Sequence, residues 1–191
     1  MKKGIIVLIS GPSGVGKGTI LKELINNKAL NLTFSVSMTT RAKREKEVHG
    51  EHYFFVSQEE FAANLKRDNF LEHATFVGNS YGTPKDYVFN LLNEGKNVLI
   101  EIEVKGAKTL ISKVDPEDII SFYIMPPSVD DLIYRLKHRG TEDDATIMRR
   151  AEQFKDEIKY KDQYDHAVVN DDLETCIKEV TALIEARINK K

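Results

Sequence analysis

Short apolar runs recur along the chain and are separated by segments with helical spacing. Apolar stretches occupy residues 5–9, 97–102 and 119–125, and a shorter one lies at residues 166–169. Continuous apolar runs of this length are typical of strands that are buried on both faces of a sheet. Their alternation with helices predicts an α/β fold with three layers, in which helices cover both faces of a parallel sheet.

Helix starts are marked by capping signals in the polar positions. Thr83 precedes Pro84, which predicts an N-cap followed by proline at the first helical position, and Gly95 predicts the end of that helix. Two other places have the spacing of a capping box, Ser57 with Glu60 and Ser128 with Asp131.

Two stretches depart from this alternation. Residues 35–83 hold short aromatic strand-like pieces and no crossover helix, so they predict an inserted small mixed β-sheet. Residues 127–160 are charged, helical and rich in arginine, with Gly140 as a break, and they predict a helical lid. The predicted core is then assembled from residues 1–34, 84–126 and 161–191 within one domain.

The composition narrows the class of function. The chain has 191 residues, of which 41% are hydrophobic and 30% charged, and its net charge is −2. These values are ordinary for a globular protein and argue against nucleic-acid binding by phosphate neutralisation. The one cysteine, Cys176, lies in an amphipathic helical segment, where we expect a buried apolar role. A single cysteine fits a reducing compartment, so the expected location is cytoplasmic.

The N-terminus resembles the start of a signal peptide only superficially. Lys2 and Lys3 precede the apolar run, but that run is short and leads directly into a glycine-rich segment. We therefore expect a buried strand there, and we expect no membrane partner because no segment has the length of a membrane span.

A phosphate-binding loop follows this first strand. It comprises Gly11-Pro12-Ser13-Gly14-Val15-Gly16-Lys17 and opens a helix. Glycines let consecutive N–H groups converge on phosphate oxygens, and the helix N-terminus adds a partial positive charge. Lys17 would reach the β- and γ-phosphates of ATP. The sequence therefore predicts a P-loop NTPase core.

The loop departs from the usual pattern at one position. A serine or threonine that ligates Mg²⁺ usually follows the lysine, whereas here Gly18 follows and Thr19 comes next. We expect Mg²⁺, bound with ATP, to be held mainly by phosphates and water. Glu101, at the end of the next core strand, is a candidate outer-shell partner, and a plain surface carboxylate is the alternative.

A second cluster of charge lies in the predicted small sheet. Arg41 and Arg44 stand close together and are followed by Tyr53. Two guanidinium groups and a phenol can bracket a phosphate dianion, because a guanidinium matches two phosphate oxygens at once. Taken alone, such a loop also fits a solvated surface or a weak nucleic-acid patch.

This region resembles the guanylate kinase family. The run T-T-R-x-x-R-x-x-E-x-x-G-x-x-Y-x-F, from Thr39 to Phe55, is similar to the GMP-binding signature of that family. Further similar segments occur in order along the chain: residues 35–37, 70–72, 78–83, 101–106, 126–128, 139–141 and 169–172. The resemblance covers about residues 5 to 185, nearly the whole chain.

The resemblance implies a role for each matching position. It implies that Ser37 and Thr83 contact guanine O6, and that Glu72 and Glu103 accept hydrogen bonds from N1 and the 2-amino group. It also implies phosphoryl transfer from ATP to GMP or dGMP. The residues implied to hold the GMP phosphate are Arg41, Arg44, Tyr53 and Tyr81. Those implied to act on the transferred phosphoryl and ATP are Lys17, Arg135, Arg139 and Arg150, with Arg41 also catalytic. The ATP-binding set adds Gly11, Pro12, Ser13, Gly14, Val15, Gly16, Gly18, Thr19 and the adenine-side Asn170.

Two other functions remain open on the sequence. One is a kinase for a different nucleoside monophosphate, against which the Glu72 and Thr83 pairing favours guanine. The other is a non-catalytic interaction module, of the kind that tends to lose the lysine of the phosphate loop. Lys17 is intact here, which favours an enzyme. The oligomeric state is open.

Overall fold

A computed structural model describes residues 2–191. Its core is a five-stranded sheet in the order β2-β7-β1-β8-β9, in which each neighbouring pair is parallel. The strands are β1 (Ile6–Ser10), β2 (Leu32–Phe34), β7 (Asn97–Glu101), β8 (Ile119–Met125) and β9 (His166–Val169). The predicted parallel sheet and four of its strands are therefore confirmed.

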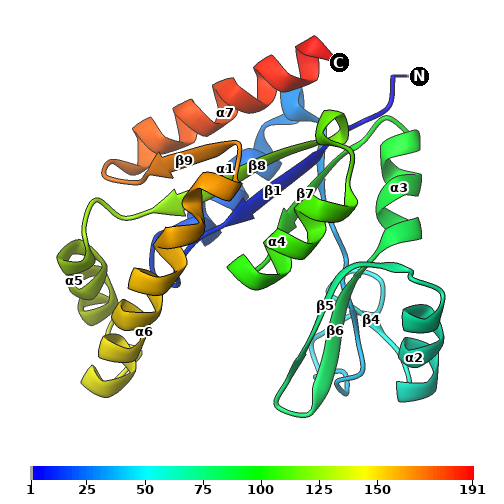
Figure 1. The fold of residues 1–191 in the computed structure, drawn as a ribbon, viewed down its shortest axis with the longest axis horizontal. Coiled ribbons are helices and arrows are strands. Elements are labelled where there is room, and N and C mark those ends of the chain that lie inside the picture. The colour runs from blue at the N-terminus through cyan, green and yellow to red at the C-terminus, as the bar shows by residue number, and fades with distance from the viewer. Residues whose placement is uncertain (1) are drawn as a thin grey trace.

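Helices cover both faces of this sheet, as the alternation predicted (Figure 1). Side chains of β1 point to the two faces in turn: Ile6 and Leu8 join one apolar cluster, and Val7 joins the other. The first face is covered by α3 (Lys85–Asn93) and α4 (Val104–Lys113), and the second by α1 (Lys17–Asn26) and α7 (Leu173–Lys190). Cys176 lies on the buried face of α7, and burial raises the pKa of its thiol to about 11, which confirms its apolar role.

The inserted small sheet is also confirmed. Its order is β4-β3-β6-β5, with β3 and β4 parallel and the other pairs antiparallel. Its strands are β3 (Met38–Thr39), β4 (Phe54–Phe55), β5 (Phe70–Phe76) and β6 (Asn79–Pro84). Helix α2 (Gln58–Lys66) packs on it through Phe61, which stacks on Phe70 with ring centroids 4.5 Å apart.

The expected N-cap at Thr83 is wrong. Strand β6 continues through Thr83 to Pro84, which pairs with Phe70 of β5, so α3 begins only at Lys85 and has no side-chain cap. Tertiary pairing thus overrides the local Thr-Pro signal. The other capping signals are confirmed: Ser57 and Ser128 each accept a hydrogen bond from the backbone three residues on.

The charged stretch forms two helices, α5 (Val129–Arg139) and α6 (Asp144–Glu157). Gly140 ends α5 with a φ of 65°. In Figure 1 this pair and the small sheet lie at opposite lower corners of the view, below the core. Short 3-10 helices complete the fold: η1 (Lys28–Leu30), η2 (Pro116–Asp118) and η3 (Ile158–Gln163). Within residues 2–191, every helix is too short or too polar to cross a bilayer.

Candidate active site

The phosphate loop joins β1 to α1. Gly16 precedes the helix with a φ of 98°, and Gly11 has a φ of 143°. A Cβ atom added at Gly11 would lie 2.1 Å from the Ile124 carbonyl oxygen, so no larger residue fits there without moving β8. The loop therefore takes its shape from the backbone, and that shape depends on contact with the neighbouring strand.

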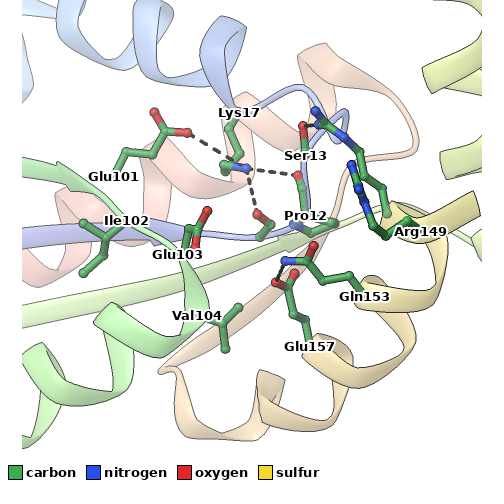
Figure 2. A pocket seen from close by; sticks show the side chains of 12 residues that line it. Pro12, Ser13, Lys17, Glu101, Ile102, Glu103, Val104, Arg149, Gln153 and Glu157 are labelled. Atoms are coloured by element: carbon green, nitrogen blue, oxygen red, sulfur yellow. Dashed lines mark hydrogen bonds and ion pairs between the residues drawn. The ribbon is translucent and has the colours of Figure 1, made fainter. Parts of the chain in front are cut away.

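Lys17 is held against its own loop (Figure 2). Its Nζ donates to the carbonyl oxygens of Gly11 at 2.7 Å and Pro12 at 3.0 Å, and lies 3.9 Å from Glu101 Oε1. Burial lowers the pKa of Lys17, and the nearby carboxylates of Glu101 and Glu157 oppose that shift. To reach a bound phosphate, the ammonium group must exchange these carbonyl contacts for phosphate oxygens.

A cavity of about 550 Å³ opens beside Lys17 (Figure 2). Three segments enclose it: the phosphate loop, residues 101–104 and one face of α6. From α6 come Arg149, Gln153 and Glu157, and Gln153 donates to Glu157 Oε1 at 2.6 Å. These three residues had no predicted role on the sequence alone. Their spacing of four residues places them on one helix face, which is the signal that could have revealed them.

The predicted arginines of the lid lie around the same loop. Arg150 hydrogen bonds to Ser13 in the loop and pairs with Glu142 at 2.6 Å. Arg135 and Arg139 approach from α5, where a second cavity of about 440 Å³ separates them from the phosphate loop. The structure thus brings all three predicted arginines to the phosphate loop.

The residues around this second cavity fit a magnesium ion. Thr19 and Glu101 both line it, together with Gly18 and Lys17. A hydroxyl and a carboxylate are hard oxygen donors, which Mg²⁺ accepts when phosphates and water complete its shell. Among residues 2–191, no group of three or more His, Cys, Asp or Glu side chains is placed to hold a metal.

A second polar site lies in the small sheet. The Arg41 guanidinium lies 5.6 Å from the ring centroid of Tyr53 and 5.7 Å from that of Phe55. Tyr53 in turn contacts the ring of Tyr81 edge-on, with centroids 6.1 Å apart. Three of the four residues predicted to hold a phosphate therefore converge. The fourth, Arg44, is an exposed residue on the same loop.

A buried carboxylate lies farther inside this sheet. Thr83 Oγ1 donates to Glu72 Oε1 at 2.7 Å, and the two residues are 0% and 8% exposed. Burial raises the pKa of Glu72. Ser37, also predicted for this site, lies just before β3 and accepts a backbone hydrogen bond from Phe54. The structure therefore joins Glu72 to Thr83 by a hydrogen bond in which the Thr83 hydroxyl is the donor and the carboxylate the acceptor.

Helix α4 links the two sites. Glu103 immediately precedes it and lines the cavity beside Lys17. Gly106 lies in its first turn, and a Cβ there would come 3.0 Å from Glu72 Oε2. Because one helix touches both, the cavity at the phosphate loop and the Glu72 carboxylate lie on neighbouring parts of the molecule.

Comparison with known proteins decides the family. A family model described as guanylate kinase matches residues 3–187. The chain belongs to the guanylate kinase family. Guanylate kinases are nucleoside monophosphate kinases, so the parallel core with its P-loop and the separate small sheet are the framework of that enzyme class.

Individual relatives agree. The chain is 50% identical to a guanylate kinase of Mesoplasma florum over 95% of its own length, and it spans 61% of the length of that relative. It is 45% identical to a guanylate kinase of Malacoplasma penetrans, covering 100% of this chain and 97% of the other. The crystal structure of guanylate kinase from Anaplasma phagocytophilum matches with a TM-score of 0.68 and 30% identity, over 97% and 87% of the two chains.

Asn170 has a structural contact that the guanylate kinase resemblance did not imply. Its side chain is 3% exposed, and its Nδ2 donates to the Val15 carbonyl oxygen of the phosphate loop at 2.7 Å. Asn170, which directly follows β9, therefore holds the phosphate loop in place from that edge of the sheet. A direct contact with adenine stays a prediction.

Proposed function

We propose that this chain transfers the γ-phosphoryl group of ATP to GMP or dGMP, giving ADP and the corresponding diphosphate. The observation that carries the proposal is the link through α4, where Glu103 borders the P-loop cavity and Gly106 borders Glu72. A base held at Glu72 would have its phosphate near Arg41 and Tyr81, on the side of the small sheet, while ATP occupies the phosphate loop.

Base recognition follows from donor and acceptor matching. Guanine presents N1–H and N2–H₂ next to the acceptor O6. The Glu72 carboxylate, already desolvated, would accept from the two donors, while Thr83 turns its proton from Glu72 to O6. Adenine would instead place the lone pair of N1 against a buried carboxylate, which costs several kcal/mol, on the order of an unpaired buried polar group.

Transfer itself requires positioning and positive charge. Lys17 and the arginines of α5 and α6 surround the phosphate loop and would stabilise charge on the equatorial oxygens of the moving group. No general base is needed, because the acceptor phosphate is already largely ionised at neutral pH. We propose Mg²⁺ as the divalent metal, held near Thr19 and Glu101, where it would neutralise charge on the ATP phosphates.

The lid must also exclude water, since an open site would hydrolyse ATP. Arg150 already contacts Ser13 across the cavity, which indicates how α6 can close over the loop. The proposed setting is cytoplasmic purine nucleotide metabolism, with recycling of GMP.

A panel of acceptors tests the proposal. ATP and Mg²⁺ are supplied with GMP, dGMP, AMP, CMP or UMP, and ADP release is followed in a coupled assay. The proposal expects turnover with GMP and dGMP, and kcat/KM at least about a hundredfold lower with the other acceptors. Equal turnover of AMP would favour a kinase of broader specificity. Absence of turnover with every acceptor would favour the non-catalytic interaction module.

A further inference from the structure

Glu47 connects two parts of the loop that carries Arg41 and Arg44. Its Oε1 lies 2.6 Å from Arg41 Nη2, and its Oε2 accepts a hydrogen bond from the Arg44 backbone N–H at 2.8 Å. The side chains of Arg41 and Glu47 are only 17% and 15% exposed. One carboxylate therefore fixes both the guanidinium and the turn that follows it.

The rest of the Arg41 environment leaves the guanidinium few alternatives. Arg41 Nη1 donates to the Ala42 carbonyl oxygen at 2.9 Å, and the Arg41 backbone N–H donates to Thr39 Oγ1 at 3.2 Å. The rings of Tyr53 and Phe55 lie against the guanidinium. Of these contacts, only Glu47 supplies an opposite charge. Since a guanidinium has five N–H groups, others remain for a ligand.

The charge of Glu47 is informative. Hydrogen bonds from Arg41 and from the Arg44 backbone lower the pKa of Glu47 to about 2, so the carboxylate is ionised at neutral pH. A negative charge beside a site for a phosphate dianion weakens the attraction for that dianion. A carboxylate in this place therefore costs binding energy by its charge and can assist only through the geometry that it imposes.

We propose that Glu47 is a positioning residue of the acceptor phosphate site: it orients the Arg41 guanidinium, and holds the loop from Arg41 to Glu47, to receive the phosphate of the nucleoside monophosphate. The proposal rests on the proposed function, because it takes Arg41 as a phosphate ligand. Glu47 acts through Arg41 and touches no substrate.

The test compares Glu47→Ala and Glu47→Gln with the parent, and uses Glu45→Ala, at an exposed glutamate of the same loop, as the matched control. Glu47→Ala is expected to raise the KM for GMP by about 10- to 100-fold, while the KM for ATP stays within about twofold and kcat within about threefold. Glu47→Gln keeps one acceptor oxygen and so restores part of the affinity. Glu45→Ala is expected to match the parent.

Equilibrium binding of GMP, measured by calorimetry without ATP, separates this proposal from the proposed function. A Kd for GMP that rises from the parent to Glu47→Gln and again to Glu47→Ala supports the positioning role of Glu47, whether or not the chain turns over GMP. An unchanged Kd and KM in Glu47→Ala overturns it, as does a loss of affinity for ATP and GMP alike together with a lowered Tm. If the parent binds and phosphorylates another monophosphate, the proposed function fails, and the same ranking with that acceptor still decides the role of Glu47. A parent that binds none overturns both.

Discussion

The proposed function assigns the donor to the phosphate loop and the acceptor to the small sheet, and these two regions would bind their ligands with different parts of the chain. The shape of the loop depends on its main chain: Gly11 and Gly16 take positive φ values, and Gly11 lies against the Ile124 carbonyl without room for a side chain. The site in the small sheet is built from side chains, and Glu72, Thr83 and Arg41 come from separate segments. The phosphate loop has to recognise only the triphosphate group of the donor, and backbone N–H groups are sufficient for that. Telling one base from another requires side chains with a defined donor and acceptor pattern.

This comparison leads to a division of labour that substitutions can break. Substitutions of the charged residues around the phosphate loop should act mainly on kcat, because the positive charge of these residues matters most while the phosphoryl group is being transferred. Changes in the small sheet should act mainly on the affinity for the acceptor and on the choice of base.

The largest effect is expected from Lys17→Ala, which removes the ammonium group that donates to the carbonyl oxygens of the phosphate loop. We expect kcat to fall by roughly 10²- to 10⁴-fold with little change in Tm, because the lysine contributes mainly in the transition state. Steady-state kinetics and thermal unfolding check this, with Lys22→Ala, at an exposed lysine of the same helix, as the control. A folded Lys17→Ala protein with more than about half the parent activity contradicts the assignment of the loop.

A smaller and more discriminating effect is expected from two arginines. Arg139→Ala removes a charge that lines the cavity at the phosphate loop, so we expect mainly a lower kcat, by about 10- to 100-fold. Arg44 lies on the same loop as Arg41, so Arg44→Ala should mainly raise the KM for GMP, by about tenfold. Kinetics with both substrates varied measure the split. The reverse pattern in the two variants would end the proposed division.

The smallest effect concerns acid stability. The pKa of Glu47 is about 2 in the folded chain against a usual 4.5, because Arg41 and Arg44 bind its ionised form. Its stabilising contribution is therefore present above about pH 4.5 and is lost as the pH falls toward 2. The Tm difference between the parent and Glu47→Gln should be largest above pH 5 and shrink as the pH falls to 3. Glu72, whose raised pKa acts in the opposite sense, is common to both proteins and cancels. A Tm difference that is constant with pH would show that the charge of Glu47 contributes no stability.

The sequence predicted the elements whose signals are local. The phosphate loop is contiguous from Gly11 to Lys17, and β1, β7 and β8 are apolar runs buried on both faces, so periodicity and spacing were enough. Strand β2 was missed because it has three residues at the edge of the sheet and ends in Phe34, which is 44% exposed. Thr83 was misplaced because a Thr-Pro pair indicates a helix cap locally, whereas pairing with β5 carries the strand past it.

The candidate site was predictable to a lesser degree, because its contacts are long-range. Glu72 and Thr83 meet only when β5 and β6 pair, and their roles came from the family resemblance. Glu47 stood in the quoted signature without a role, since its two bonds form only in the folded loop. One face of α6 carries Arg149, Gln153 and Glu157. A role for these residues can be recognised only in the folded chain, where α6 lies beside the cavity at the phosphate loop.

The central claim is that the small sheet selects guanine through Glu72, and one comparison tests it most directly. The kcat/KM values for GMP and for IMP, which lacks the 2-amino group, are measured for the parent, Glu72→Gln and the surface control Glu51→Gln. An amide at position 72 places a donor against a donor, so we expect Glu72→Gln to weaken GMP by roughly 2–4 kcal/mol and to penalise IMP less. The GMP-to-IMP ratio should therefore fall, while Glu51→Gln keeps the parent ratio. An unchanged ratio, with less than about a threefold loss on GMP, would contradict the claim and move base selection to Glu103.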